Sequence, residues 1–285
     1  MKLGYQKLTV FNYQITYYVF RIFTLFWVGE QYQFFKINSE RPQLFYNPVT
    51  DFQKYLQSEF PSSLYFIALC IILVVNLLWS IFKPNYISNV LIFLTTALIN
   101  LPINGYFGLS HTNHVLILFY FLTIFLLPNK LVTTDYKLVQ YVNFGLLATY
   151  SAAGLWKVFS MARDTLTKNP DISWLEPDAA RINSEVNFYM IDLPLPIWMQ
   201  QLYSNTEFWV VLTVIGILFQ TLCALGAFNR KYLTFTLIFL FTFHFYTKIF
   251  VIADLKIMKY GIVLMFFPYH YFYGLIKKQF PNFGV

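Results

Sequence analysis

Charged residues are scarce in this sequence: Asp, Glu, Lys and Arg make up only 12% of its 285 residues. Soluble domains carry about 25% charged residues. A soluble fold with 58% hydrophobic residues would therefore lack polar side chains to cover its surface. The basic residues behind the net charge of +7 are scattered singly or in pairs between apolar runs, as in membrane loops. We expect a lipid bilayer as a partner and no nucleic acid.

Cysteine is equally rare, and Cys70 and Cys223 both lie inside apolar runs. Two such residues provide neither a disulfide framework nor a zinc site, so we expect small buried hydrophobes. The usual motifs of nucleotide-binding loops, zinc proteases and serine hydrolases are absent. The pair His111 and His114 lacks a nearby carboxylate or third histidine, so we expect no metal site. No residue pattern in the sequence identifies a cofactor.

Long apolar runs are what the sequence has instead, and each membrane span needs about 20 such residues. They predict an all-α, polytopic membrane helical bundle, a single domain over residues 1–285 with about eight transmembrane helices. We expect the spans near 10–28, 61–82, 88–104, 112–128, 137–160, 206–227, 231–252 and 257–276.

Two longer connections separate these runs, at about 29–60 and 161–205. Connections of this length usually contain structure of their own, so we expect short helices packed against the bundle. In the second connection, residues 178–191 (DAARINSEVNFYMI) are typical of an amphipathic helix lying on the membrane surface.

The lysines and arginines of the short loops indicate the orientation. With a cytoplasmic N-terminus, that side collects Lys2, Lys7, Lys83, Lys130, Lys137, Arg230, Lys231, Lys277 and Lys278. Only Lys256 and Lys259 oppose this arrangement. We expect both termini in the cytoplasm, both long connections outside, and a bacterial inner (plasma) membrane as the location.

Charged groups within spans cost at least ~2.5 kcal/mol at mid-helix and need a reason. Arg21 lies deep in the first expected span, Lys157 near the outer end of the fifth, and His244 and Lys248 one turn apart in the seventh. Each also has a structural interpretation. Lys157 could extend to headgroups, His244 could bond a neighbouring helix, and Arg21 could form a buried ion pair.

Small residues precede the lysine in the fifth expected span. The run Ser151, Ala152, Ala153 and Gly154 is typical of a surface on which another helix packs closely.

Four segments, in this order, resemble one membrane family. They are VFRIFTLFWVG around Arg21, TNHVLILFYFLTIFLLPNKLVTTD around Asn113 and His114, YSAAGLWKVFSMARDTLTKNPDISWLEP around Lys157, and FTFHFYTKIFVIADLKIMKYGIVLMF around His244. Over about residues 15–268 the chain resembles the horizontally transferred transmembrane helix family. These are the bacterial relatives of the membrane region of the vitamin K-dependent gamma-carboxylase.

The resemblance implies roles for individual residues. In the carboxylase, the lysine matching Lys157 is the base that activates the reduced quinone. Oxygen then converts the quinone into a strong base that removes a proton from a glutamate side chain, and carbon dioxide adds. A lysine base needs apolar surroundings, which favour the neutral amine. His244, Arg21 and the pair Asn113–His114 match further polar positions of the family.

The chain also departs from the family. The second polar element has histidine where this chain has Lys130, and tryptophan and serine where it has Val132 and Thr133. After the tryptophan turn the family usually has glycine, where this chain has Pro177. The expected topology places Lys130 and Lys157 at opposite membrane faces. The soluble domain that binds the carboxylase's protein substrate has no counterpart here, so we expect no glutamyl carboxylase.

Two functional hypotheses follow. The first is a non-catalytic subunit of a larger membrane assembly, such as a secretion or transport complex, with other membrane proteins as partners. The alternative is a membrane-embedded enzyme or quinone- or lipid-binding protein that uses Lys157 as a base in an outward-facing pocket formed with His244 and Arg21. In that case the Lys157 and His244 side chains should lie within about 10 Å of each other, at most two helical turns apart in depth. Transport is disfavoured, because broken helices in two matching halves are not visible.

Overall fold

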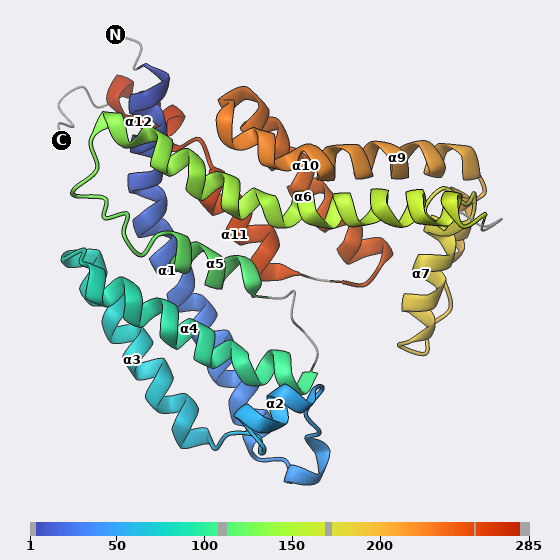
Figure 1. Ribbon diagram of the computed structural model, residues 1–285, viewed down its shortest axis with the longest axis horizontal. Coiled ribbons are helices and arrows are strands. Elements are labelled where there is room, and N and C mark those ends of the chain that lie inside the picture. Colours follow the sequence, from blue (N-terminus) through green and yellow to red (C-terminus); the bar gives the residue numbers. More distant parts are fainter. Residues whose placement is uncertain (1–3, 108–112, 169–172, 254, 280–285) are drawn as a thin grey trace. The chain divides into compact units, whose positions relative to one another are not determined.

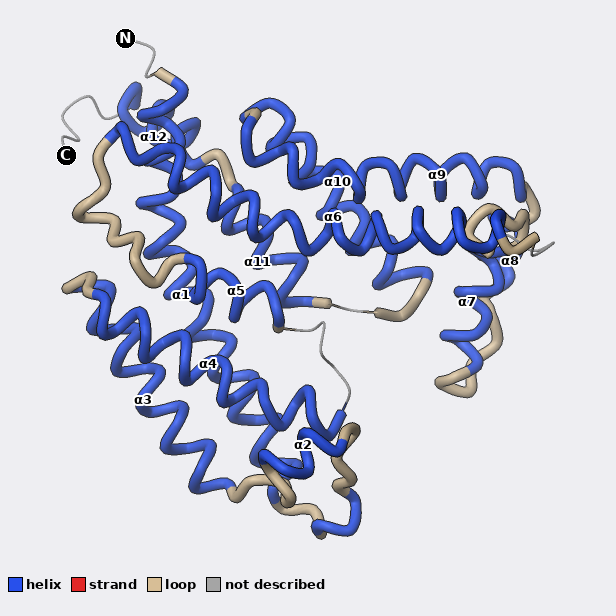
Figure 2. The backbone as a smooth tube through the Cα atoms, viewed as in Figure 1, coloured by secondary structure: helices blue, strands red, loops and turns tan. Residues whose placement is uncertain are grey.

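The computed structural model describes residues 4–107, 113–168, 173–253 and 255–279, which form twelve α-helices and three short 3₁₀ helices (Figure 1). Figure 2 shows that the rest of these ranges is loop, with no strand. The expected all-α class is confirmed. The chain divides into two compact units, Met1–Val142 with Lys256–Val285, and Asn143–Leu255. The expected single domain stays a prediction, and each unit is described by itself.

The first unit is built around α1, a 35-residue helix against which α3 and α11 pack. Its elements are α1 (Tyr5–Ser39), η1 (Gln43–Phe45), α2 (Asp51–Leu56), α3 (Ser63–Phe82), α4 (Tyr86–Phe107), α5 (His114–Leu122), η2 (Thr133–Asp135), the first residues of α6 (Tyr136–Leu166), α11 (Lys256–Phe266) and α12 (Tyr269–Gln279).

The second unit holds the rest of α6 and the helices that pack on it. They are α7 (Ala179–Tyr189), α8 (Ile197–Tyr203), α9 (Thr206–Leu222), which continues as η3 (Cys223–Phe228), and α10 (Arg230–Phe250). In Figure 1, α6 and α9 run side by side. They are antiparallel, because Ser151 contacts Ala224 whereas Lys157, further along α6, contacts the earlier Gln220.

Within the described ranges, four helices are long and apolar enough to cross a membrane: α3, α4, α9 with η3, and α10. They match the expected spans at 61–82, 88–104, 206–227 and 231–252. Only 22–50% of the residues in their most apolar windows are buried, so much of their apolar surface faces outward. Such surface requires a cover of lipid or protein.

Two further helices, α1 and α6, are longer than the spans expected at 10–28 and 137–160. They have 35 and 31 residues, but they are less apolar than the four candidate spans. The first connection is also shorter than the expected 29–60, because α1 continues to Ser39. Short helices form in both long connections.

A continuous span at 112–128 was expected and is wrong for the described residues. The helix α5 has only nine residues and ends at Leu122. Side chains of the neighbouring helices α1 and α4 bond the backbone that follows. Asn89 Nδ2 donates to the carbonyls of Thr123 and Ile124 at 3.3 and 3.0 Å, Tyr13 to Leu126 at 2.8 Å, and Gln14 to Pro128 at 2.9 Å. These partners allow the irregular backbone to be buried.

The expected span at 257–276 is likewise interrupted. Pro268 separates α11 from α12, because proline cannot donate the backbone hydrogen bond that a continuous helix needs. Side-chain hydroxyls bond two carbonyls ahead of the break: Thr16 donates to Met265 at 3.1 Å and Tyr269 to Leu264 at 2.7 Å.

Candidate functional site

Arg21 lies on the inner face of α1 and is fully buried, with 0% of its surface exposed. Its Nε donates to Ser80 Oγ at 2.7 Å, Nη1 to the Tyr17 carbonyl at 2.9 Å, and Nη2 to Asn89 Oδ1 at 2.5 Å. The guanidinium carbon also lies 3.2 Å from the centre of the Tyr17 ring. Every one of these partners is uncharged.

The buried ion pair that the sequence allowed for Arg21 is therefore not formed among the described residues, where no carboxylate lies within salt-bridge distance of it. Neutral acceptors and an aromatic face compensate the charge instead. Because the side chain is enclosed and three helices supply its acceptors, Arg21 fixes the packing of α1, α3 and α4 rather than facing a ligand.

Asn113, the residue before α5, connects two other helices of the first unit. Its Oδ1 accepts from Trp27 Nε1 at 3.1 Å and its Nδ2 donates to Asn100 Oδ1 at 2.7 Å. His114 follows as the first residue of α5 and is half-buried. His111 lies outside the described residues. Asn113 therefore links α1 to α4 through its side chain, a structural role that we call a packing joint.

Two lysines of the first unit differ from each other in exposure. Lys130 is exposed, with Nζ 4.8 Å from the centre of the Tyr86 ring. Lys259, which the sequence suggested only as a loop charge, is 1% exposed within α11. The signal was present in its spacing: Ile262 and Phe266, three and seven residues later, are also buried and lie on the same helix face.

Lys157 lies on α6 in the second unit and is half-buried. Its Nζ donates to Gln220 Oε1 on α9 at 2.6 Å. It also lies 5.1 Å from the centre of the Trp174 ring and 5.8 Å from that of Phe243 on α10. The helix does not end about three residues later, as expected, but continues to Leu166. Lys157 therefore contacts protein groups instead of extending past a helix end.

Small residues bring α6 and α9 close enough for this contact. Ser151 Oγ accepts from the Ala224 backbone N–H at 2.9 Å. A Cβ at Gly154 would lie 2.5 Å from the Thr221 backbone nitrogen, so only glycine fits there. The expected close-packing surface is confirmed for these two residues, whereas Ala152 and Ala153 are exposed.

His244 lies in the C-terminal half of α10, is 2% exposed, and bonds the Tyr150 hydroxyl through Nε2 at 3.2 Å. Tyr150 and Lys157 are seven residues apart on α6, which is about 10 Å along one helix face. The expected closeness of Lys157 and His244 stays a prediction. Lys248 was expected to face the same way as His244, but it is exposed.

The second unit thus presents a cation with an amide acceptor and aromatic neighbours. Among the described residues, no carboxylate lies within salt-bridge distance of Lys157, and no three His, Cys, Asp or Glu side chains gather to hold a metal ion. Such a group can donate to a carbonyl, phenolate or phosphate oxygen. Sequence reasoning missed Tyr150 as the partner of His244, although Tyr150 lies seven residues, or about two helical turns, before Lys157.

No protein-family model, no curated protein sequence and no solved structure matches the chain.

Proposed function

We propose that this chain is an integral membrane protein of carboxylase-like fold that binds a quinone or a lipid through Lys157. We further propose about eight membrane crossings, with those at 112–128 and 257–276 made by interrupted helices, both termini in the cytoplasm, and a bacterial inner membrane. The four long apolar helices support embedding in a bilayer, since their outward faces need an apolar environment. The remaining spans, the orientation and the family rest on the sequence.

The observation that carries the binding proposal is the environment of Lys157. Its ammonium has one neutral hydrogen-bond partner, Gln220, and no carboxylate partner among the described residues. A lysine has three N–H donors, so two remain for a ligand oxygen. The nearby Trp174 ring offers a flat apolar surface on which a quinone ring can stack.

The chemistry available at the site follows from these groups. Lys157 would hold a carbonyl or phenolate oxygen, and Gln220 would orient the amine. The pair of Tyr150 and His244 could hold or pass a proton at its hydroxyl and imidazole. The resemblance to the carboxylase implies a lysine base, and binding of a quinone is the step that such chemistry requires first.

Purification in a mild detergent tests this proposal. Solvent extracts of the wild-type protein should contain a quinone or a lipid in a fixed ratio to the chain. Lys157→Met should lose that molecule, and Lys137→Met, an exposed lysine on the same helix, should retain it. Equal ligand content in both variants, or no bound molecule in the wild type, would refute binding at Lys157.

A second candidate function is a non-catalytic subunit of a larger membrane assembly. One observation favours it: Lys157 and His244 already have partners within the unit, in Gln220 and Tyr150, so the helices can pack without a ligand. This function predicts a protein that co-purifies in fixed stoichiometry, and that Lys157→Met leaves the association intact.

A further inference from the structure

The helix α7 has an exposed apolar stripe. Ile182, Val186 and Tyr189 are 43%, 52% and 81% exposed, and Met190 directly after the helix is 77% exposed. At about 100° per residue these side chains share one side of the helix. The opposite side carries Ser184 and Phe188, which are buried. An ordinary surface helix has polar residues on its outward side, whereas the outward side of α7 is apolar.

Polar residues flank the stripe on both edges. On one edge, Arg181 Nε lies 3.3 Å from Asp178 Oδ1, and Arg181 Nη1 lies 3.7 Å from Glu185 Oε1. On the other edge are Asn183 and Asn187, whose side chains bond the helix itself. The stripe is thus separated from the buried face by polar residues on either side. It is a second apolar surface, distinct from the one that packs on the unit.

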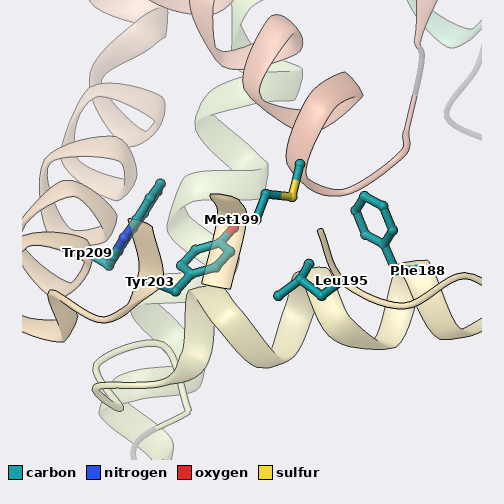
Figure 3. Close-up of a cluster of buried hydrophobic side chains, with 5 residues drawn as sticks. All are labelled: Phe188, Leu195, Met199, Tyr203 and Trp209. Carbon is teal, nitrogen blue, oxygen red and sulfur yellow. The ribbon is translucent and has the colours of Figure 1, made fainter. Parts of the chain in front are cut away.

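The buried face fixes α7 and α8 beside the ends of two candidate spans. Phe188, Leu195, Met199, Tyr203 and Trp209 form a buried cluster (Figure 3). Trp209 lies at the start of α9, and its ring centre is 5.7 Å from that of Phe250, the last residue of α10. The stripe of α7 is therefore anchored at the level where these two helices end.

The cluster also contains a buried polar contact. Ser184 Oγ and the Tyr203 hydroxyl lie 2.6 Å apart. Burial raises the pKa of the Tyr203 hydroxyl, while its hydrogen bond with Ser184 lowers the pKa to a smaller extent, so Tyr203 remains neutral at physiological pH. This contact fixes the rotation of α7 about its axis and with it the direction of the stripe.

We propose that the exposed stripe of α7 inserts into the interfacial layer of the lipid bilayer, as a surface anchor at the span ends of the second unit. This inference rests on the membrane embedding proposed above. An interfacial helix is amphipathic, lies at the level of the headgroups, and has aromatic residues such as Tyr and Trp beside it. Exposed Trp198 at the start of α8 supplies a further interfacial aromatic.

Charge indicates which lipids the stripe fits. From Asp178 to Tyr189 the charged residues are Arg181 and its two acidic partners, Asp178 and Glu185, so this segment carries one net negative charge. The helix therefore has no net attraction to anionic headgroups, and apolar insertion drives its binding. Zwitterionic lipid should suffice, and salt should have little influence.

Depth-dependent quenching tests the proposal in vesicles of zwitterionic phosphatidylcholine. A polarity-sensitive fluorophore is attached to Val186→Cys on the stripe, to Glu185→Cys on its charged edge, or to Leu218→Cys on the exposed face of α9. The buried native cysteines Cys70 and Cys223 define the background labelling. We expect blue-shifted emission at position 186 with stronger quenching by shallow than by deep nitroxide lipids, water-like emission at 185, and strong deep quenching at 218.

The three positions separate the outcomes. Water-like emission at 186 with deep quenching at 218 would overturn the anchor and leave the embedding intact. Blue-shifted emission at 186 without lipid quenching would also overturn it, because a protein would then cover the stripe. Absence of quenching at 218 would refute the embedding itself, and the anchor with it.

Discussion

Each of the two units holds a cation among apolar helices, and the two cations differ in their exposure and in their hydrogen bonds. Arg21 of the first unit is fully enclosed, with hydrogen bonds from three donor nitrogens and a tyrosine ring against its face. Lys157 of the second unit is half-buried, with a single hydrogen bond to Gln220. The comparison indicates that a charge inside an apolar helix does not by itself define a functional site. The number of hydrogen-bonded donor atoms and the exposure of the side chain distinguish Arg21, which joins helices, from Lys157, for which we propose ligand binding.

The largest effect should come from Arg21→Leu. Loss of the guanidinium leaves Ser80, Asn89 and the Tyr17 carbonyl short of a donor, so we expect a loss of about 3–5 kcal/mol in stability. Melting in detergent and the yield of folded protein measure it. Arg41→Leu, at an exposed arginine, is the control and should behave as wild type. If Arg21→Leu melted at the same temperature as the wild type, Arg21 would not stabilise the packing of the first unit.

A somewhat smaller loss is expected for Asn113→Leu. Trp27 Nε1 and Asn100 would each lose a buried partner, which costs about 2–3 kcal/mol in total. The fluorescence of Trp27 should also change, since its indole nitrogen loses its acceptor. Unchanged stability would show that water replaces Asn113 in this joint.

Gly154→Ala tests the approach of α6 to α9 that positions Lys157. The added methyl group would meet the Thr221 backbone, so we expect a destabilisation of about 1–3 kcal/mol and reduced ligand content. Gly216→Ala is the matched control, because nothing lies within 4 Å of its added Cβ. That variant should be neutral or gain up to about 1 kcal/mol from helix propensity. The same loss in both variants would contradict the close contact.

Lys157→Met should have the smallest effect on stability. It removes one hydrogen bond and leaves the Gln220 oxygen without its lysine donor, a cost of about 1 kcal/mol. Melting in detergent should therefore fall much less than for Arg21→Leu, although the bound molecule is lost. Destabilisation equal to that of Arg21→Leu would show that Lys157 is a second packing joint, and the contrast between the units would disappear.

Hydrophobicity predicted the parts of the fold that depend on local sequence. The apolar runs of α3, α4, α9 and α10 were found because lipid-length helices need only composition. The early end of α5 could not be predicted from hydrophobicity. It depends on Tyr13, Gln14 and Asn89, side chains distant in sequence that bond the carbonyls after the helix.

The candidate site divides in the same way. The positions of Arg21, Lys157 and His244 inside apolar runs were visible, because a charge there is costly. Their partners were not, since Gln220 and Tyr150 reach them only through helix packing. Lys259 was missed because a lysine near an expected turn has an ordinary explanation, although the structure buries it.

The most direct test of the Lys157 site compares two native lysines without any mutation. Protein in detergent, from which the co-purified quinone or lipid has been removed, is treated with an apolar amine-reactive ester, with and without a short-chain benzoquinone or a phospholipid, and modified peptides are quantified by mass spectrometry. We predict that Lys157 reacts, that the quinone or the lipid protects it, and that buried Lys259 remains unmodified. Protection of Lys157 equal to that of Lys259 without ligand, or reaction at Lys157 that neither molecule slows, would contradict a binding site there.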